Sequence, residues 1–409
     1  MNNRQSFLMH QAQTTHFPMM LEIAGAEGNY LVDITGKKYL DLISGISVNH
    51  LGHGNEQVKE AIIKQLNSHQ HVMIYGEFIQ SAQTQLAVSL TSLLPEDLNS
   101  VYLLSSGAEA TDVAMKLAKR ATGKSNIVAC KNAYHGSTHA ALSINSDEYY
   151  KQAFRPLLPG ISFIDFNDIS SLDQIDKNTA CVFTEVVQGE AGYVPANLCF
   201  LLALRQKCYD TGALLVFDEI QSGMGKTGKM FAFEHYQITP DILLLGKALG
   251  AGMPIGAIVA NRNLMSLFAD NPILGHITTF GGHPVVAAAA NAGILSLLSS
   301  NLLSEVAEKE AVFRKKLVHP AIKNISGKGL MLAVELDSFD NNLKVIQTCL
   351  AAGLITDWFL FANKKIRIAP PLTITKEEIE HACFIIIGAL NQVYEQVSTN
   401  IRATVNQHT

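Results

Sequence analysis

Lys247 is the residue best placed for covalent chemistry, because it lies in the apolar, glycine-rich stretch 241–252 (Asp-Ile-Leu-Leu-Leu-Gly-Lys-Ala-Leu-Gly-Ala-Gly). An amine with apolar neighbours is poorly hydrated, which lowers its pKa and frees the nitrogen to attack a carbonyl carbon. The alternative is a surface lysine whose alkyl stem lies along apolar side chains. Lys247 is thus a candidate nucleophile, and other site residues beside it would be needed to support this assignment.

Asp218 is the second candidate, at the end of the apolar run 213–218. A carboxylate at the end of a buried strand needs a cation or strong hydrogen-bond donors, because isolated burial of its charge is costly. A protonated ring nitrogen would serve, and the ring would then remain an electron sink. A helix N-cap is the alternative interpretation.

Ser106, Gly107 and Ala108 precede an apolar stripe of helical spacing. Free N–H groups at a helix start, with glycine allowing close approach, suit a phosphate. A capping box completed by Glu109 would explain the same residues without a ligand. Tyr134 offers a flat ring for stacking on a ligand, or is an ordinary half-buried tyrosine.

Arg367 lies in a strand-like run near the C-terminal end. Its guanidinium could bind a substrate carboxylate through two parallel hydrogen bonds, or it is a surface arginine on an edge strand. Two glycine motifs are set aside. Gly225-Lys226-Thr227 lacks the first glycine of a phosphate loop, since Ile220 stands there, and the stretch 250–256 is one residue too long for a dinucleotide motif.

Composition excludes several classes of function. The 409-residue chain has 48% hydrophobic residues and a formal net charge of −5, with no basic stripe for nucleic acid. Its six cysteines have no metal-site spacing, so buried thiols in a reducing cytoplasm are expected and no metal. The N-terminus has no signal-like apolar segment, and the apolar stretch 242–260 contains Lys247, so no membrane span is expected.

Seven short apolar runs are expected to be strands and to alternate with helical patterns. They are Val101–Leu104, Asn126–Cys130, Ile161–Phe166, Ala180–Val187, Ala213–Asp218, Asp241–Gly246 and Gly256–Asn261. Continuous rather than alternating apolar runs are typical of strands covered on both faces, which predicts a mostly parallel seven-stranded α/β sheet. Ligands bind beyond the carboxyl ends of such strands, where the candidate residues recur.

The chain is long enough for two domains. We expect residues 51–310 to form the large domain. We expect residues 1–50 and 311–409 to form a smaller α/β domain from both chain ends.

Taken in order, six motifs resemble those of the class III aminotransferases, which are fold-type I enzymes dependent on pyridoxal 5'-phosphate. The similarity is greatest to the ornithine and acetylornithine aminotransferases. The motifs are Ser106–Ala110, Tyr134-His135-Gly136, Gln188-Gly189-Glu190, Phe217–Gln221, Gly246-Lys247 and Thr279–Gly282.

The resemblance implies a role for each residue. Lys247 would hold the cofactor as a Schiff base and move the proton, with Asp218 on the ring nitrogen and Gln221 near the ring hydroxyl. The phosphate would lie against Ser106, Gly107 and Ala108, and the ring between Tyr134 and Ile220. Thr279 would reach the phosphate of a neighbouring subunit, which implies a homodimer with shared sites. Arg367 would bind the α-carboxylate of glutamate or 2-oxoglutarate, and Glu190 would neutralise Arg367 while the other substrate is bound.

The sequence departs from this family's pattern at Ser137, where the ornithine-type enzymes carry an arginine that binds the donor's carboxylate. We therefore expect a cytoplasmic aminotransferase that takes an amino group from an ω-amine or amino acid, ornithine-like or acetylornithine-like, and gives it to 2-oxoglutarate by a ping-pong mechanism. The alternatives are an aminomutase, decarboxylase or epimerase of the same superfamily and, more remotely, a non-catalytic binding protein on the same scaffold.

Overall fold

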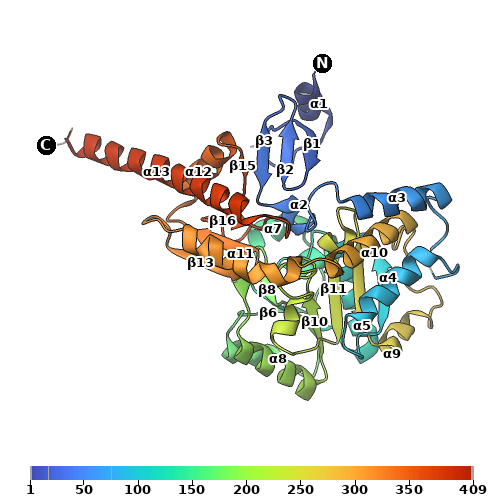
Figure 1. Ribbon diagram of the computed structural model, residues 1–409. Coiled ribbons are helices and arrows are strands. Elements are labelled where there is room, and N and C mark those ends of the chain that lie inside the picture. Colours follow the sequence, from blue (N-terminus) through green and yellow to red (C-terminus); the bar gives the residue numbers. More distant parts are fainter. Residues whose placement is uncertain (1, 17, 75, 407–409) are drawn as a thin grey trace.

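The computed structural model describes residues 2–16, 18–74 and 76–406. Its largest element is a seven-stranded sheet with the spatial order β4-β12-β11-β10-β7-β5-β6 (Figure 1). The strands are β4 (Ser100–Leu104), β5 (Asn126–Cys130), β6 (Ile161–Ile164), β7 (Thr179–Glu185), β10 (Leu214–Asp218), β11 (Ile242–Gly246) and β12 (Gly256–Ala260). The strand β12 runs antiparallel to both of its neighbours, β4 and β11, and the other neighbouring pairs of this sheet are parallel. The predicted mostly parallel α/β sheet is therefore confirmed.

Both faces of this sheet are covered, which explains the continuous apolar runs. Successive side chains of a strand point to opposite faces, and Leu243 and Leu244 of β11 accordingly belong to different hydrophobic clusters. The cluster on one face includes α5 (Gly107–Thr122). The cluster on the other face includes α8 (Leu198–Thr211) and α10 (Pro284–Leu298).

Five of the seven predicted strands agree with the structure to within one residue at each end. The predicted strand Ile161–Phe166 is wrong at its end, because its partner β5 ends at Cys130, opposite Ile164. The predicted strand Ala180–Val187 is also wrong at its end. The chain leaves the sheet after Glu185, and Val187–Gln188 (β8) pairs instead with β9 (Val194–Pro195).

The two ends of the chain meet in a smaller sheet. The parallel pair is β3 (Lys38–Asp41) and β15 (Leu354–Ile355), and the antiparallel strands β2 (Tyr30–Asp33) and β1 (Ile23–Glu27) extend it. In Figure 1 these blue N-terminal strands stand beside the orange and red C-terminal elements. The contribution of both ends is thus seen directly, while the domain boundaries at residues 50 and 310 stay a prediction.

A third sheet is antiparallel and consists of β13 (Asn324–Lys328), β14 (Met331–Glu335) and β16 (Lys365–Ile368), with Arg367 on β16. Three helices accompany it: α11 (Leu302–Lys316), α12 (Phe339–Ala351) and α13 (Lys376–Asn406). The end of α13 projects away from the rest of the chain in Figure 1.

The remaining α-helices are mostly short. They are α1 (Asn3–His10), α2 (Ser44–Ser47), α3 (Glu56–Ser68), α4 (Ser81–Ser92), α6 (His139–Ser143), α7 (Glu148–Lys151) and α9 (Arg262–Met265). Within the described ranges no single helix is long and apolar enough to cross a membrane. The helices α10 and α11, which are bent by 71° relative to each other, are together long and apolar enough by length and composition alone.

Candidate active site

A cavity of about 420 Å³ opens at the carboxyl ends of the parallel strands. Eight of the eleven predicted site residues line it: Ser106, Gly107, Ala108, Tyr134, Asp218, Ile220, Gln221 and Lys247. They come from four separate strand ends, so the fold brings together residues that are up to about 140 positions apart in the chain.

Lys247 follows directly after β11 and is half-buried in the cavity wall. Its backbone has a φ of 44°, in the left-handed region that non-glycine residues rarely adopt. Burial lowers the pKa of its amine, and the charge of Arg367 adds to this effect, against the opposing pull of Glu190 and Asp218. A neutral, nucleophilic form of the amine is therefore more accessible than in an exposed lysine.

Asp218 is buried at the end of β10 and bonded on both of its oxygens. Oδ2 lies 2.7 Å from Nδ1 of His135, and Oδ1 accepts the N–H of Ile220 at 2.9 Å. Although burial opposes protonation of His135, the hydrogen bond and charge of Asp218, with Glu185, raise the pKa of this imidazole. His135 therefore supports the buried carboxylate of Asp218 with a hydrogen bond from within the fold.

The first turn of α5 forms one end of the cavity. The Glu109 carboxylate accepts the N–H of Ser105 at 2.8 Å rather than that of the N-cap residue Ser106, so the predicted capping box is not closed. What forms is a simple cap, in which the Ser106 hydroxyl accepts the N–H of Glu109 at 3.2 Å. It uses only one helical donor of this turn, and the N–H groups of Gly107 and Ala108 remain for a ligand. The cap and the proposed phosphate contact are therefore compatible.

Glycine is required on two sides of this turn. A Cβ on Gly107 would lie 2.8 Å from Cδ1 of Ile220. A Cβ on Gly136, whose φ is 128°, would lie 2.5 Å from the Cβ of Ala108. The loop after β5 can therefore pack directly on the start of α5, which places the half-buried Tyr134 in the cavity wall, with its hydroxyl 3.0 Å from Oγ of Ser137.

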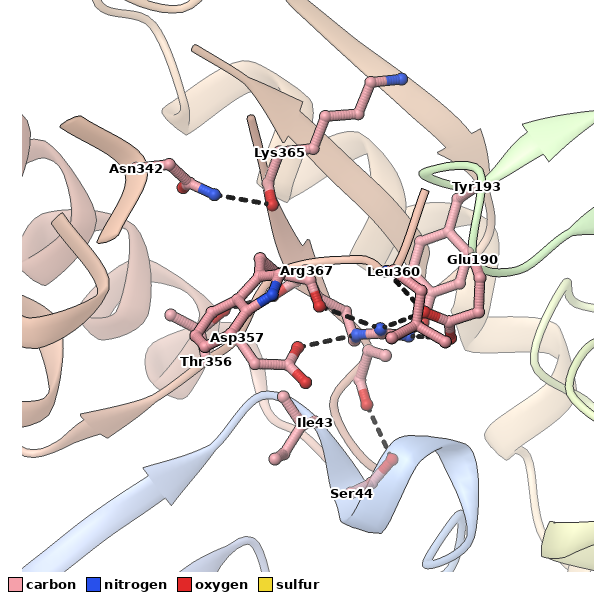
Figure 2. A network of polar contacts seen from close by, with 12 residues as sticks. Ile43, Ser44, Glu190, Tyr193, Asn342, Thr356, Asp357, Leu360, Lys365 and Arg367 are labelled. Carbon is pink, nitrogen blue, oxygen red and sulfur yellow. Dashed lines mark hydrogen bonds and ion pairs between the residues drawn. The ribbon is translucent and has the colours of Figure 1, made fainter. Parts of the chain in front are cut away.

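Arg367 and Glu190 form an ion pair outside the lining of this cavity (Figure 2). The two terminal nitrogens of Arg367 each lie 3.0 Å from an oxygen of Glu190, and its Nε donates to Oδ1 of Asp357 at 2.7 Å. Arg367 is on an edge strand, yet it is only 2% exposed, so the surface interpretation is wrong. Burial raises and the guanidinium lowers the pKa of Glu190, and the net effect is a lowered pKa.

A comparison with protein families assigns a chemistry to this site. The model of the family "Aminotransferase class-III" matches residues 11–390. The chain belongs to the class-III aminotransferases. The acetylornithine aminotransferase of Bacillus subtilis (strain 168) is 39% identical over 88% of this chain and 93% of its own length. A [LysW]-aminoadipate semialdehyde/glutamate semialdehyde transaminase of Sulfurisphaera tokodaii is 36% identical over 88% and 92%.

Solved structures agree with this assignment. An ornithine aminotransferase from Toxoplasma gondii, described with partial occupancy of PLP at its active site, superposes with a TM-score of 0.89 at 29% identity, covering 96% of this chain and 94% of that one. A transaminase from the marine bacterium Virgibacillus gives a TM-score of 0.90 at 25% identity, covering 96% and 99%. The chain is therefore a pyridoxal-phosphate-dependent aminotransferase, similar to the acetylornithine and ornithine enzymes.

The cavity of this class-III aminotransferase fits that cofactor on three observations. The free N–H groups at the start of α5 suit its phosphate. A buried carboxylate, Asp218, lies across the same cavity, where a protonated ring nitrogen would meet it. Oε1 of Gln221 is buried without a hydrogen-bond partner among the described residues, so it is available to accept a hydroxyl group.

Thr279 lies elsewhere, exposed in the loop before α10 and outside the cavity lining. Two buried titratable residues of the cavity lining were not singled out from the sequence, His135 and Glu185. Glu185 ends β7 and lines the cavity, and burial raises its pKa to about 8. A carboxylate at the end of a continuous apolar strand, the signal used for Asp218, would have identified it.

Proposed function

We propose that this aminotransferase takes an amino group from an ω-amine or amino acid, ornithine-like or acetylornithine-like, and gives it to 2-oxoglutarate. Glutamate is the product, and the two substrates react one after the other at the same site, as in a ping-pong mechanism. The observation that carries the proposal is the buried pair of Arg367 and Glu190, whose charges act on Lys247.

We assign the cofactor contacts to the residues of the cavity. Gly107, Ala108 and Ser106 would hold the phosphate, and Asp218, with Gln221 on the ring hydroxyl, would hold the ring edge. Tyr134 and Ile220 would lie on its two faces. When bound, pyridoxal phosphate supplies a carbonyl carbon that accepts amines and an electron-withdrawing ring.

Lys247 has two tasks in this proposal. Its lowered pKa favours the neutral amine, which would bind the carbonyl carbon of the cofactor with loss of water and be displaced by the incoming substrate amine. The freed Nζ would then take the proton from the carbon that carries the substrate's amino group and deliver it to the former carbonyl carbon of the cofactor.

The pair of Arg367 and Glu190 supports two unlike substrates at one site. With Glu190 in place, the guanidinium is neutralised and a donor without a carboxylate near its reacting amine can bind. When Glu190 gives way, the same guanidinium can take the α-carboxylate of 2-oxoglutarate through two hydrogen bonds.

The donor is less closely specified. Ser137 lies beside Tyr134 in the cavity wall, at the position where the ornithine-type pattern has an arginine, and it offers a hydroxyl rather than a cation to the donor's far end.

The test is a mixture of the purified protein, pyridoxal phosphate, 2-oxoglutarate and single amines, among them ornithine, N-acetylornithine and putrescine, assayed for glutamate. We expect glutamate with at least one amine, and none when the keto acid is left out. Lys247→Ala should abolish multiple turnover, and borohydride should fix the cofactor on residue 247 only in the wild type, as read by mass spectrometry. Repeated turnover by Lys247→Ala without added amine would refute the role of Lys247.

We further propose a homodimer in which Thr279 contacts the phosphate bound by the other subunit. Exposed apolar side chains near Thr279 support this: Ile79 is 98% exposed, Phe280 58% and Phe78 54%. We also propose a cytoplasmic location, which the six free cysteine thiols support, since a reducing compartment keeps them unpaired.

A further inference from the structure

Asp357 is a second carboxylate on Arg367, and the two residues lie on facing stretches of backbone. The N–H of Arg367 donates to the carbonyl of Asp357 at 2.9 Å, and the hydroxyl of Thr356 donates to the carbonyl of Arg367 at 2.5 Å. These bonds hold the main chain of Asp357 beside that of Arg367, so the 2.7 Å contact between Oδ1 and Nε joins two fixed points (Figure 2).

Glu190 reaches the same guanidinium from a different part of the fold. It lies in the turn between β8 and β9, and its carboxylate meets the terminal nitrogens of Arg367. The N–H of Leu360 also donates to Oε2 of Glu190 at 3.1 Å. The two carboxylates therefore occupy different edges of one guanidinium, Asp357 at Nε and Glu190 at the forked end (Figure 2).

Three consecutive residues, Asp357, Trp358 and Phe359, fix the guanidinium without any help from Glu190. The carboxylate of Asp357 takes Nε, and the carbonyl of Trp358 accepts from a terminal nitrogen at 3.2 Å. The ring of Phe359 lies 4.3 Å from the guanidinium carbon. Position and plane of the guanidinium are thus set by a segment that stays with Arg367.

The charge of Arg367 also requires a carboxylate that stays when Glu190 leaves. Arg367 is buried, and a buried guanidinium left with no carboxylate is strongly unfavourable. If Glu190 alone paired with Arg367, its departure would create that state before a substrate arrived. The ion pair of Asp357 is made at Nε and not at the forked end, so it does not have to break when Glu190 leaves.

We propose that Asp357 is a positioning residue, which holds the guanidinium by Nε while the forked end passes from Glu190 to the carboxylate of the keto acid. This inference rests on the proposed function, because it needs a substrate carboxylate at Arg367.

The two half-reactions should depend on Asp357 to different degrees. Glu190 has a flexible side chain and can follow a displaced guanidinium, so the amine half-reaction depends little on Asp357. A keto acid whose reacting carbon is already placed at the cofactor cannot follow it. Loss of Asp357 should therefore weaken binding of the keto acid selectively.

The experiment compares wild-type holoenzyme with Asp357→Ala and Asp357→Asn, and with Asp340→Ala as a matched loss of charge at an exposed site on α12. We expect Asp357→Ala to raise KM for 2-oxoglutarate about tenfold or more, as expected for loss of a charge-assisted hydrogen bond. The affinity for glutarate, a dicarboxylate without a keto group, measured by calorimetry should fall in parallel. The single-turnover rate with the amine alone should change less than twofold, roughly within the effect of a surface substitution.

Asp357→Asn keeps an oxygen acceptor for Nε but loses the charge, so it should recover part of both losses, whereas Asp340→Ala should match the wild type. Equal losses in both half-reactions, with no recovery in Asp357→Asn, would indicate a structural role only and overturn the proposal. An unchanged KM and glutarate affinity in Asp357→Ala would also overturn it. A wild-type enzyme that makes no glutamate from any amine would refute the proposed function, and this inference with it.

Discussion

At the residue scale, the pairing of Glu190 with Arg367 makes a prediction for each substrate separately. In Glu190→Ala the forked end of the guanidinium is open and only Asp357 remains as a carboxylate partner. The keto acid then has no competitor for Arg367, and we expect its KM to fall about tenfold, which corresponds to roughly 1.4 kcal/mol. The KM of the amine donor should rise by a similar factor, because the donor then faces an uncompensated cation.

Steady-state kinetics with each substrate varied in turn would measure both changes. Glu190→Gln is the matched control, since it retains the acceptor and the size of the side chain but loses the charge. Its two KM values should lie between those of the wild type and those of Glu190→Ala. A KM for 2-oxoglutarate that rises in Glu190→Ala would contradict the exchange at Arg367.

At the scale of elements, Lys226 connects the loop after β10 to the segment that follows β16 through hydrogen bonds. Its Nζ donates to the carbonyls of Ala369 (3.1 Å) and Pro370 (2.5 Å), and its own carbonyl accepts the N–H of Leu330 at 3.0 Å. Lys226 is fully buried, and burial lowers the pKa of its amine to about 7. The segment that carries Arg367 is therefore held by an amine that titrates near neutral pH.

This pKa gives a pH dependence with a definite sign. Above pH 7 the folded protein releases the proton of Lys226, while the unfolded chain keeps it up to its ordinary value of 10.5. The unfolded state thus binds more protons in this window, and the contribution of Lys226 to stability increases as pH rises from 7. Relative to Lys226→Met, the wild type should gain on the order of 2 kcal/mol between about pH 7 and about pH 9.

Thermal unfolding of both holoenzymes across this range would measure the difference. Lys226→Met should also be less stable at every pH by about 1–3 kcal/mol, since it leaves two buried carbonyls without a donor. Parallel pH profiles for the two proteins would contradict the lowered pKa.

The strands of the central sheet were predictable because a strand covered on both faces must be apolar throughout, and the runs ending at Cys130 and Asp218 leave little choice of boundary. The spatial order of the strands was not predictable in this way. The strand β12 has the same apolar character as its neighbour β11, to which it runs antiparallel, since both are buried on two faces. Direction depends on the connection between them and not on side-chain type.

The residues of the candidate site also divide into those that local sequence could predict and those that only the fold reveals. Lys247 and Asp218 stood out because a charged residue in an apolar run is unusual whatever lies around it. Asp357 did not stand out, because its importance comes from Arg367, ten residues away, through a pairing that only the folded backbone creates. His135 lay within a recognised motif, but its bond to Asp218 crosses 83 positions.

At the scale of the whole molecule, exposed apolar side chains gather on the segment before α4 and on the loop before α10. A further cavity of about 540 Å³ lies between these segments, lined by Phe78, Ile79, Thr278 and Gly281 among others. Ile79 is almost fully exposed in the single chain, and Phe78 and Phe280 are exposed as well. Grouped exposed apolar side chains of this kind mark an interface.

Ile79→Glu should therefore weaken the proposed homodimer by about 100-fold, the effect of losing a central apolar contact and burying a charge. Sedimentation velocity would measure the monomer fraction, and titration of the cofactor's absorbance would measure its affinity. Because Thr279 is proposed to reach the other subunit's phosphate, the affinity for the cofactor should fall as the dimer dissociates. Tyr209→Glu, an exposed site on α8, should change neither. A dimer of unaltered stability in Ile79→Glu would refute this interface.

The pairing of β3 with β15 also sets the order in which the chain matures on the ribosome. Residues 38–41 find their strand partner only at residues 354–355, so more than 300 residues must be translated before the N-terminal sheet is complete. Until then, the edge of β3 that β15 later covers is open to other chains. The growing polypeptide therefore carries an unprotected strand for most of its synthesis, and it is in this window that chaperones have the most to shield.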